Sequence, residues 1–425
     1  MRIVIVTDQY PPMVGGVPTV TRQLATDLAN RGHQVWVVAP SYGSRDIYRI
    51  EQKVRVYRFS SFEWPTYEDL RIAYLPFFPV RRLLKKADPD VIHIHSPVVL
   101  GNIAQILAGG LRKPVIVTNH YLPINFSHAL TTDPVLGRPF NTVTYSYLVH
   151  FCNRCEYVTA PSATALNLLY EHGLRAPART ISNGIDLTHF RPGPPDEELR
   201  QRLNLPADGP LILSLNRLSQ EKRIDVIIEA VSKMRQPAYL AIAGSGPVEE
   251  ELRARVDAQA LHDRVGFLGF VSDLDLVSLY RLADIFGIAS EADLQSLTTM
   301  NALACGLPVV AANSYALPEL VHHAVNGFLF APGDSAEMAG YLDHLVSDAR
   351  LRQSMGAQSL EIIVAHDRVR VLEEWETLYR RLSNEFREAR ERRLRLRLAR
   401  KIPRHRRPAA HVPQIVRTGP FHGTR

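Results

Sequence analysis

The sequence predicts an α/β protein made of two doubly wound, Rossmann-like parallel-sheet domains in series, with a cleft between them. Three observations support this fold class. Short β-rich runs alternate with helical patterns in the first half, a Pro/Gly-rich stretch interrupts them at 186–196, and the alternation then restarts. Continuous apolar strands separated by helices are typical of parallel sheets covered on both faces. A chain of 425 residues has room for two such domains.

The first domain is predicted over 1–187, and a linker follows over 188–200. A helical pattern over 19–32 ends on Gly32, as a left-handed cap would. The expected strands of this domain are 2–8, 34–41, 54–60, 91–96, 114–120, 156–162 and 179–184.

The second domain is predicted over 201–365, a C-terminal helix over 366–384, and a basic, disordered tail over 385–425. The tail is expected to be disordered because it is rich in Arg and then in Pro, Gly and His, and so cannot bury a core. The expected strands of the second domain are 211–218, 239–246, 265–271, 285–290, 308–314 and 327–333.

The chain is organised around the stretch 283–313 in the second domain. An apolar run over 285–289 predicts a buried strand, a polar loop follows over 290–296, and a helix ends before Gly306. An acidic loop therefore lies between the carboxyl end of a strand and the amino terminus of a helix. Open α/β sheets bind nucleotides and anions at such places.

Composition limits the classes of protein that the chain can belong to. Three cysteines are too few for a disulfide framework, and we expect Cys152 and Cys155 to be reduced thiols. The apolar run at the amino terminus is too short for a signal sequence, and no apolar span of membrane length occurs. We therefore expect a cytoplasmic protein that can lie peripherally at the inner face of the membrane.

Six segments, in this order, resemble the retaining GT-B glycosyltransferases of family 4. The resemblance covers roughly 330 residues and implies the GT-B fold, with an acceptor-side first domain and a nucleotide-sugar-binding second domain. The segments are YPPMVGGVPTVTRQLATDLANRGHQVWVVAPS (10–41), PDVIHIHSP (89–97) with TNHYLP (118–123), NGIDLTHFRPG (183–193), LNRLSQEKRID (215–225), AGSGPVEEELR (243–253) and SEADLQSLTTMNALACGLPVV (290–310).

The resemblance implies a hexosyltransferase whose co-substrate is a nucleotide diphosphate sugar, a UDP- or GDP-sugar, with no metal and no other cofactor. Negative charge collects on the leaving diphosphate, so the site needs fixed cations and N–H donors. Arg217 and Lys222 match the family's diphosphate-binding positions. The amides of Ser296, Leu297 and Thr298 open a predicted helix and are suited to a phosphate oxygen.

The sugar side of the site is expected to draw on both domains. Gly15 and Gly16 follow the first strand, where the missing Cβ lets the backbone approach the donor. His120 ends the strand PVIVTNH and resembles the family's histidine beside the sugar. The segment beside the nucleotide base is Gly269, Phe270 and Val271.

The chain departs from the family at the E-x7-E motif. Asp293 and Asn301 stand where the family has two glutamates, which contact the donor sugar and the ribose hydroxyls. Glu291 is an alternative first carboxylate. Asn301 retains hydrogen bonding but loses a charge-assisted bond, worth about 1 kcal/mol.

No metal site is expected from the sequence. Asp273 and Asp275 form a DxD sequence, but in a different context from the metal-binding DxD of the other glycosyltransferase fold. His93 and His95 share one strand face without an evident third ligand and are expected to be structural.

Charge is concentrated near the carboxyl end. Residues 380–407 hold twelve Arg and one Lys against three Glu, whereas residues 1–379 carry a net charge of −5. The polybasic segment 390–407 suits an anionic membrane surface, and the alternative is a solvated tail. The acceptor is expected to be a sugar or a lipid, and if the segment docks on a membrane, the family resemblance implies a lipid. Nucleic acid is disfavoured because no aromatic residues interleave the arginines.

Three rival functions remain for comparison. A non-catalytic protein that binds a nucleotide sugar would bind donor without turnover, and a sugar-nucleotide epimerase would turn over donor without an acceptor. A dinucleotide oxidoreductase is disfavoured because no G-x-G-x-x-G follows the first strand.

Overall fold

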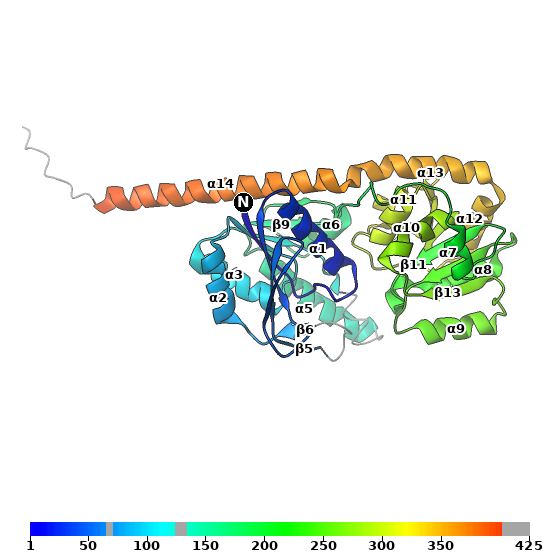
Figure 1. Cartoon of the computed structure of the whole chain (residues 1–425), viewed down its shortest axis with the longest axis horizontal. Helices are drawn as coiled ribbons and strands as arrows, with labels where there is room; N and C mark the ends of the chain where they lie inside the picture. Colours follow the sequence, from blue (N-terminus) through cyan, green and yellow to red (C-terminus); the bar gives the residue numbers. More distant parts are fainter. Residues whose placement is uncertain (65–70, 124–133, 402–425) are drawn as a thin grey trace, which may run out of the picture. The chain divides into compact units, whose positions relative to one another are not determined.

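The computed structural model describes residues 1–64, 71–123 and 134–401 and contains two parallel sheets with helices on their faces (Figure 1). Residues Met1–Ser383 pack as one compact unit, and a second unit begins at Asn384. Within the first unit we call β1 to β10 with their helices the first lobe, and β11 to α13 the second lobe. The α/β fold with two parallel sheets, predicted from the alternating pattern, is confirmed.

The first lobe is built on an eight-stranded sheet of order β10-β9-β8-β7-β1-β2-β4-β3, parallel except for the β3–β4 pair. Its strands are β1 (Arg2–Val6), β2 (Gln34–Pro40), β3 (Ile47–Glu51), β4 (Val54–Phe59), β7 (Val91–Ile94), β8 (Val115–Thr118), β9 (Tyr157–Ala160) and β10 (Ala178–Thr180). A separate hairpin pairs β5 (Ser61–Glu63) with β6 (Arg71–Ala73). The helices are α1 (Gly16–Asn30), α2 (Phe77–Ala87), α3 (Val99–Leu111), α5 (Pro134–Cys152) and α6 (Ala163–Glu171).

The second lobe is built on a six-stranded parallel sheet of order β13-β12-β11-β14-β15-β16. Its strands are β11 (Leu211–Leu215), β12 (Tyr239–Ala243), β13 (Val265–Gly269), β14 (Ile285–Ile288), β15 (Val309–Ala312) and β16 (Gly327–Phe330). The helices of this lobe and of the segment before it are α7 (Glu197–Arg202), η1 (Gln220–Lys222), α8 (Ile224–Lys233), α9 (Glu249–Ala258), α10 (Asp273–Leu282), α11 (Leu297–Ala304), η2 (Leu317–Glu319), α12 (Ser335–Ser347), α13 (Ala349–Ile363) and η3 (Val364–His366).

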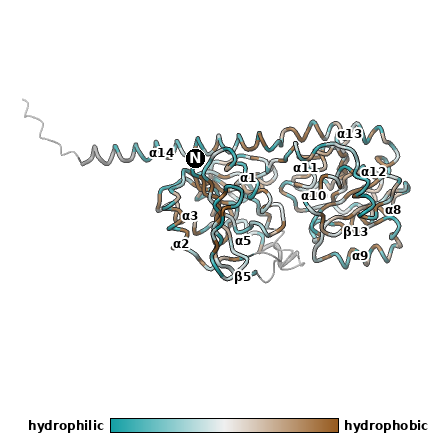
Figure 2. Tube along the Cα trace, in the orientation of Figure 1, coloured by the Kyte–Doolittle hydropathy of each residue, from teal (hydrophilic) through white to brown (hydrophobic). Residues whose placement is uncertain are grey.

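Every strand expected from the sequence is present, and each is shorter than its apolar run because the last residues form loops at the strand ends. The strands β3, β5 and β6 were not expected. β3 is an antiparallel edge strand whose side chains are mostly exposed, so it lacks the buried apolar run that marks the central strands. The central strands carry hydrophobic residues along their length (Figure 2).

The C-terminal helix differs from its expected extent. It was expected over 366–384 with a disordered tail from 385, whereas α14 runs from Arg368 to Lys401. Leu, Glu and Arg are good helix formers, and ion pairs four residues apart, such as Arg392–Glu388, support the added turns. The rest of the predicted tail, 402–425, lies outside the described residues.

The chain crosses between the lobes twice, and the two crossings run together. The amide of Ile185 donates to His366 O at 2.9 Å, and the amide of Arg368 donates to Ile185 O at 2.9 Å. α14 then packs on the first lobe, where Trp375 and Tyr379 are buried in its core. The start of α14 therefore belongs to the first lobe in packing, although it follows the second lobe in sequence.

Each sheet has one switch point, where consecutive connections run to opposite sides of a strand. In the first sheet the connections leave β1 in opposite directions, toward β2 and toward β7. In the second sheet the order reverses between β11 and β14. Ligands of open α/β sheets bind outside the carboxyl ends of the strands at such switch points. The connections that follow β1, β11 and β14 carry Gly16 at the start of α1, Lys222 at the end of η1, and Asp293.

Candidate functional site

The loop after β11, which carries Arg217, is held by two glycines of the AGSG segment. A Cβ on Gly244 would lie 1.9 Å from Asn216 O, and one on Gly246 would lie 2.2 Å from Leu218 O. The amide of Leu218 donates to the carbonyl of the intervening Ser245 at 2.9 Å. Only glycine permits this close backbone approach, so the two segments lock one another. The exposed side chain of Arg217 thus projects from a fixed backbone.

Lys222 and Asp293 form an ion pair between the loops after β11 and β14. Lys222 Nζ lies 2.8 Å from Asp293 Oδ1 and 3.4 Å from Ser290 Oγ. The two charged side chains are only 17% and 14% exposed. The other carboxylate oxygen, Asp293 Oδ2, is buried and has no hydrogen-bond partner among the described residues. The predicted phosphate lysine and the predicted sugar-side carboxylate are therefore direct neighbours.

Glu291, the alternative first carboxylate, is directed elsewhere. Its Oε1 accepts a hydrogen bond from Arg223 at 2.5 Å, and Arg223 also contacts Asp225 at 3.3 Å. These side chains line a cavity of about 460 Å³, bordered by α9 and by the loops that follow β11, β14, β15 and β16. Arg223, which forms an ion pair with Glu291, was not predicted as a site residue from the sequence. Both carboxylates are therefore paired, Glu291 with Arg223 and Asp293 with Lys222, and Asp293 is the one that contacts the predicted phosphate lysine.

The amino terminus of α11 presents backbone donors beside this pair. The Ser296 hydroxyl accepts from the amide of Thr299 at 3.2 Å and caps the helix. Helix geometry leaves the amides of Leu297 and Thr298 without intrahelical acceptors. Tyr280 donates its hydroxyl hydrogen to Thr298 O at 3.0 Å and so fixes this turn against α10. The structure thus places Leu297 and Thr298 at the start of α11, and their role in phosphate binding stays a prediction.

Asn301, predicted to hold the ribose, is nearly buried on the inner side of α11. Its exposed fraction is 8%, and its side chain hydrogen-bonds to the hydroxyl of Tyr280. Burial raises the pKa of Tyr280 and this hydrogen bond opposes the rise, so the phenol remains neutral. The asparagine thus has a structural partner in addition to its proposed ligand.

The loop 290–296 contacts both lobes through alternating side chains. Ala292 and Leu294 are buried among the core residues of the first lobe. Gln295 Oε1 accepts the amide hydrogen of Asn183 at 2.8 Å. A Cβ on Gly16 would lie 3.7 Å from Leu297 Cδ1, so the start of α1 meets the start of α11. The predicted glycine loop and the predicted phosphate helix are therefore in contact, with Gly15 as the residue that precedes α1.

His120 lies beyond β8 and contacts a second histidine. His120 Nε2 and His95 Nδ1 are 3.0 Å apart, and the two rings are stacked. Burial lowers the pKa of His120 to about 4, so the imidazole is neutral near pH 7. His95 Nε2 is buried without a partner among the described residues. His95, expected to be only structural, therefore orients the proposed catalytic histidine.

His93 continues this polar network toward α14. Its Nδ1 lies 2.7 Å from the Tyr379 hydroxyl, and its Nε2 lies 2.6 Å from Thr118 Oγ1. Burial lowers the pKa of both His93 and His95 well below the ordinary value, so neither carries charge near neutrality. All four histidine and tyrosine rings in this network are thus held as neutral hydrogen-bonding groups.

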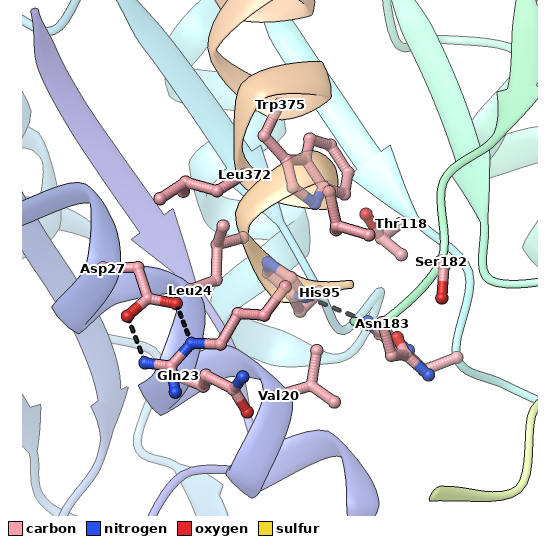
Figure 3. Close-up of a pocket in the computed structure, with 13 residues that line it drawn as sticks. Val20, Gln23, Leu24, Asp27, His95, Thr118, Ser182, Asn183, Leu372 and Trp375 are labelled. Atoms are coloured by element: carbon pink, nitrogen blue, oxygen red, sulfur yellow. Dashed lines mark hydrogen bonds and ion pairs between the residues drawn. The ribbon is translucent and has the colours of Figure 1, made fainter. Parts of the chain in front are cut away.

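A small pocket adjoins the histidines and is shown in Figure 3. His95 follows β7, Trp375 lies on α14 and Asp27 lies on α1, and all three line the pocket. Asp27 forms an ion pair with Arg368, which also pairs with Asp186 at 3.0 Å. The pocket volume of about 20 Å³ has room for one water molecule but not for a sugar. His120 is one of the residues that line it.

The segment beside the proposed base site lies at the end of β13. Gly269 adopts a φ of 66°, which favours glycine, and its carbonyl accepts from the amide of Gly244 at 2.7 Å. Phe270 is 67% exposed, and Val271 is partly buried against the core of the second lobe. An exposed aromatic ring next to a fixed backbone turn is a suitable surface for a planar base.

The remaining polar motifs have structural partners. Asp275 accepts from the capping residue Ser272 at 3.0 Å and pairs with Arg202, while Asp273 opens α10. Cys152 and Cys155 are buried thiols, and burial raises the pKa of Cys152 to about 12. In the described part of the chain, no group of three or more His, Cys, Asp or Glu side chains is arranged to hold a metal ion. Within the same part, no helix is long and apolar enough to cross a membrane.

Comparisons with known proteins show the family to which the chain belongs. Residues 14–189 match the family described as Glycosyltransferase Family 4, and residues 195–361 match the family described as Glycosyl transferases group 1. The chain is 30% identical over 375 residues to alpha-monoglucosyldiacylglycerol synthase of Streptococcus pneumoniae, covering 86% of this chain and 83% of the relative. It is 28% identical over 353 residues to GDP-mannose-dependent alpha-mannosyltransferase of Mycolicibacterium smegmatis, covering 82% and 90% of the two chains.

Solved structures resemble the fold over nearly the whole of their chains. HepE of Anabaena in complex with UDP matches with a TM-score of 0.72 at 24% identity, covering 89% of this chain and 99% of that chain. This likeness concerns the arrangement of the two lobes' elements rather than a shared substrate.

Proposed function

The chain belongs to the family 4 glycosyltransferases and is a hexosyltransferase, and we propose that it moves a hexose from a nucleotide diphosphate sugar to an acceptor hydroxyl with retention and without a metal. The observation that carries this proposal is the Lys222–Asp293 pair beside the amino terminus of α11. It places a cation, a carboxylate with one unpartnered oxygen, and helix amides at one sheet switch point.

The diphosphate is assigned to Arg217, Lys222 and the first amides of α11. Bond breaking leaves a full negative charge on the outer phosphate, and donors fixed before the reaction stabilise that charge without reorganisation. Lys222 would exchange Asp293 for a phosphate oxygen or be shared between them, because an ammonium group has three donors. The locked backbone around Arg217 lowers the entropy cost of positioning the guanidinium.

The hexose is assigned to Asp293 and His120, one from each lobe. The neutral imidazole of His120 can donate one hydrogen bond to a sugar hydroxyl while its other nitrogen faces His95. Asp293 is preferred to Glu291 because its Oδ2 is unpartnered while Glu291 is paired with Arg223. Asn301 is assigned to the ribose and the Gly269–Val271 segment to the base.

Retention follows if the acceptor attacks from the side of the leaving group. The acceptor oxygen forms a bond to the anomeric carbon as the bond from that carbon to the phosphate oxygen breaks. The proton of the acceptor hydroxyl passes to the departing phosphate oxygen, so no separate general base is needed. Fixed cations at Arg217 and Lys222 balance the diphosphate charge in this step.

Donor and acceptor classes are proposed from the relatives. HepE was crystallised with UDP, and the Mycolicibacterium smegmatis relative is GDP-mannose-dependent, so UDP- and GDP-hexoses are the donors to test. The Streptococcus pneumoniae relative is named for synthesis of a glucosylated diacylglycerol, which favours a lipid acceptor at the membrane surface. The Arg-rich segment 390–407 supports this placement at the inner face through its charge.

A second candidate function is favoured by one observation. Asn301 replaces a glutamate and is buried against Tyr280, which weakens its assignment to a ribose. A protein with that change can bind a nucleotide sugar without transferring it. Such an accessory protein would be stabilised against heat by donors but would release no nucleotide.

The test is a nucleotide-release screen of UDP- and GDP-hexoses with a lipid extract present and absent. We expect release that depends on the extract, and a loss of at least about 100-fold in Lys222→Ala. Lys233→Ala is the matched control, because Lys233 also pairs with a carboxylate at 2.8 Å, Glu229, but at the far end of α8. Donor-induced thermal stabilisation with no release under any condition would favour the accessory protein.

A further inference from the structure

Strand β3 is the most exposed of the four edge strands of the two large sheets. Three of its five side chains are exposed, and the other two are partly buried. Of the other edge strands, β10 has only three residues, β13 has no exposed side chain, and β16 is mostly buried. An edge strand presents backbone N–H and C=O groups that can pair with another strand. β3 is therefore the edge at which a further strand can be added.

The turn between β3 and β4 determines which backbone groups of β3 point away from the sheet. Gln52 and Lys53 form a two-residue turn in which both φ angles are positive, at 47° and 68°. In such a hairpin the residue that precedes the turn, Glu51, bonds to the neighbouring strand. Because the pattern alternates along an antiparallel pair, the outward-facing backbone groups of β3 belong to Tyr48 and Ile50.

One face of β3 carries exposed apolar side chains that continue a row across the sheet. Ile50 is 65% exposed, and Tyr48 is 50% exposed. Ile50 lies opposite Arg55 of β4, which in turn lies opposite Trp36 of β2. The Arg55 guanidinium lies 5.0 Å from the centre of the Trp36 ring, and the Tyr48 ring lies 4.5 Å from the ring of Tyr57. The row ends in water at Ile50, because β3 is the last strand of the sheet.

The other face of β3 carries two opposite charges at alternate positions, Arg49 and Glu51. Arg49 is exposed and lies within ion-pair distance of no Asp or Glu in the described part of the chain. Glu51 accepts hydrogen bonds from Arg58 at 3.0 and 3.2 Å, and its side chain remains 36% exposed. A carboxylate has about four acceptor positions, so Glu51 can also accept a second guanidinium.

We propose that β3 pairs antiparallel with β3 of a second copy of this chain, about a two-fold axis at Ile50. Ile50 then lies opposite Ile50 of the second copy, and Arg49 lies opposite Glu51, so the dimer gains two ion pairs. The next registers that keep the same faces together place Arg49 opposite Arg49, or Glu51 opposite Glu51. Like charges directly opposite one another are destabilising, so charge selects one register.

A second copy fits this edge better than an unrelated extended peptide. A peptide would have to supply an apolar residue for Ile50 and a carboxylate for Arg49 at the correct spacing, whereas β3 supplies both itself. Pairing of two identical edges about a two-fold axis also closes the assembly, so growth stops at the dimer.

The proposed dimer does not involve the proposed site residues. β3 lies at one edge of the first sheet, and β10, after which the chain crosses to the second lobe, lies at the other. The proposal rests on the β3 edge alone and holds whether or not the chain transfers a sugar.

The test is sedimentation velocity of the full chain over roughly a hundredfold range of concentration. Arg49→Glu and Glu51→Lys each place like charges opposite one another in the dimer. Mixed in equal amounts, the two variants restore both pairs, because one supplies two carboxylates and the other two cations. The control is Arg175→Glu, the same charge reversal at an exposed arginine shortly before β10.

Circular dichroism establishes that each variant is folded. Glu51→Lys also removes the contact with Arg58 inside the chain and can disturb the hairpin. Arg49→Glu decides the question alone in that case, because Arg49 has no ion-pair partner among the described residues of its own chain.

We expect the wild-type sedimentation coefficient to rise with concentration from that of a monomer to that of a dimer. Arg49→Glu and Glu51→Lys should each raise the dissociation constant by at least about tenfold, because two attractive pairs become repulsive. The equal mixture should recover dimerisation, and Arg175→Glu should match the wild type. A monomer at every concentration, a dimer that Arg49→Glu does not weaken, a mixture of folded variants that stays monomeric, or assembly beyond the dimer would overturn the proposal.

Discussion

The ion pair between Lys222 and Asp293 gives the sharpest prediction about the second lobe. We consider replacing Lys222 by Met, which keeps the apolar stem, and Asp293 by Asn, which keeps the shape. Each change removes one charge and leaves the other in a mostly buried position, at 17% and 14% side-chain exposure. A double-mutant cycle isolates the energy of the pair from other effects of each substitution.

The size of the coupling energy depends on how far the two charged side chains are buried. Removing one partner of a fully buried pair costs about 3–5 kcal/mol, whereas an exposed pair four residues apart contributes about 0.3–0.5 kcal/mol. Lys222 and Asp293 are closer to the buried limit but keep some contact with water. We therefore expect a coupling energy of roughly 1–3 kcal/mol in the free energy of unfolding.

The assay is urea unfolding followed by far-UV circular dichroism. Tryptophan fluorescence is unsuitable, because Trp36, Trp64 and Trp375 lie in the first lobe or in α14 and do not report on the second sheet. The control cycle uses Lys233→Met and Glu229→Gln, a pair with the same 2.8 Å separation but 42% and 47% exposure. Its coupling should stay near or below 0.5 kcal/mol.

Ligand binding separates the roles of the two partners. Asp293→Asn leaves Lys222 available to the diphosphate, so UDP or GDP should bind at least as tightly as to wild type. Sugar transfer should nevertheless fall by about 100-fold or more, because the sugar-side charge is lost. A coupling energy equal to that of the control pair, together with unchanged transfer, would refute the assignment of this pair to the site.

Three further predictions concern single residues. Burial lowers the pKa of His120 to about 4, so turnover should not decline from pH 7 to about 5 through this group, and His120→Ala should lower turnover about 100-fold without weakening nucleotide binding. Burial raises the pKa of Asp8 from 3.8 to about 7, so the folded state holds this proton more tightly and stability should fall as pH rises through that window. The free energy of unfolding should fall by roughly 4 kcal/mol at most, and Asp8→Asn should remove this pH dependence in urea titrations. Ser296→Ala removes the cap on Thr299 and should cost about 1 kcal/mol of stability, measured by the same unfolding assay.

The sequence predicted those parts of the fold that depend on local pattern. Buried parallel strands leave apolar runs, and Gly306 marks the end of the helix that precedes it. The exposed edge strand β3 leaves no such run and was missed. The end of α14 was misplaced because a charged helix has no buried face from which a periodic pattern can be recognised.

The sequence predicted individual residues of the candidate site, but it did not predict which of their side chains contact one another. Arg223 was not singled out and His95 was expected to be only structural, because their contacts with Glu291 and His120 join distant parts of the chain. The contact of Leu294 with the first lobe is likewise invisible in a polar loop read alone. Such contacts form only in the tertiary fold. Hydrophobic periodicity and short motifs carry information only about residues that are close in the sequence.

The central claim is that the chain transfers a hexose from a nucleotide to an acceptor. The most direct measurement follows a donor labelled in the sugar and compares nucleotide released with label recovered in the acceptor. We predict equal amounts, with the label in an anomeric linkage of the donor's configuration by NMR and with both quantities falling together in Lys222→Ala. Release of nucleotide without label in any acceptor, or an inverted linkage, would contradict the claim.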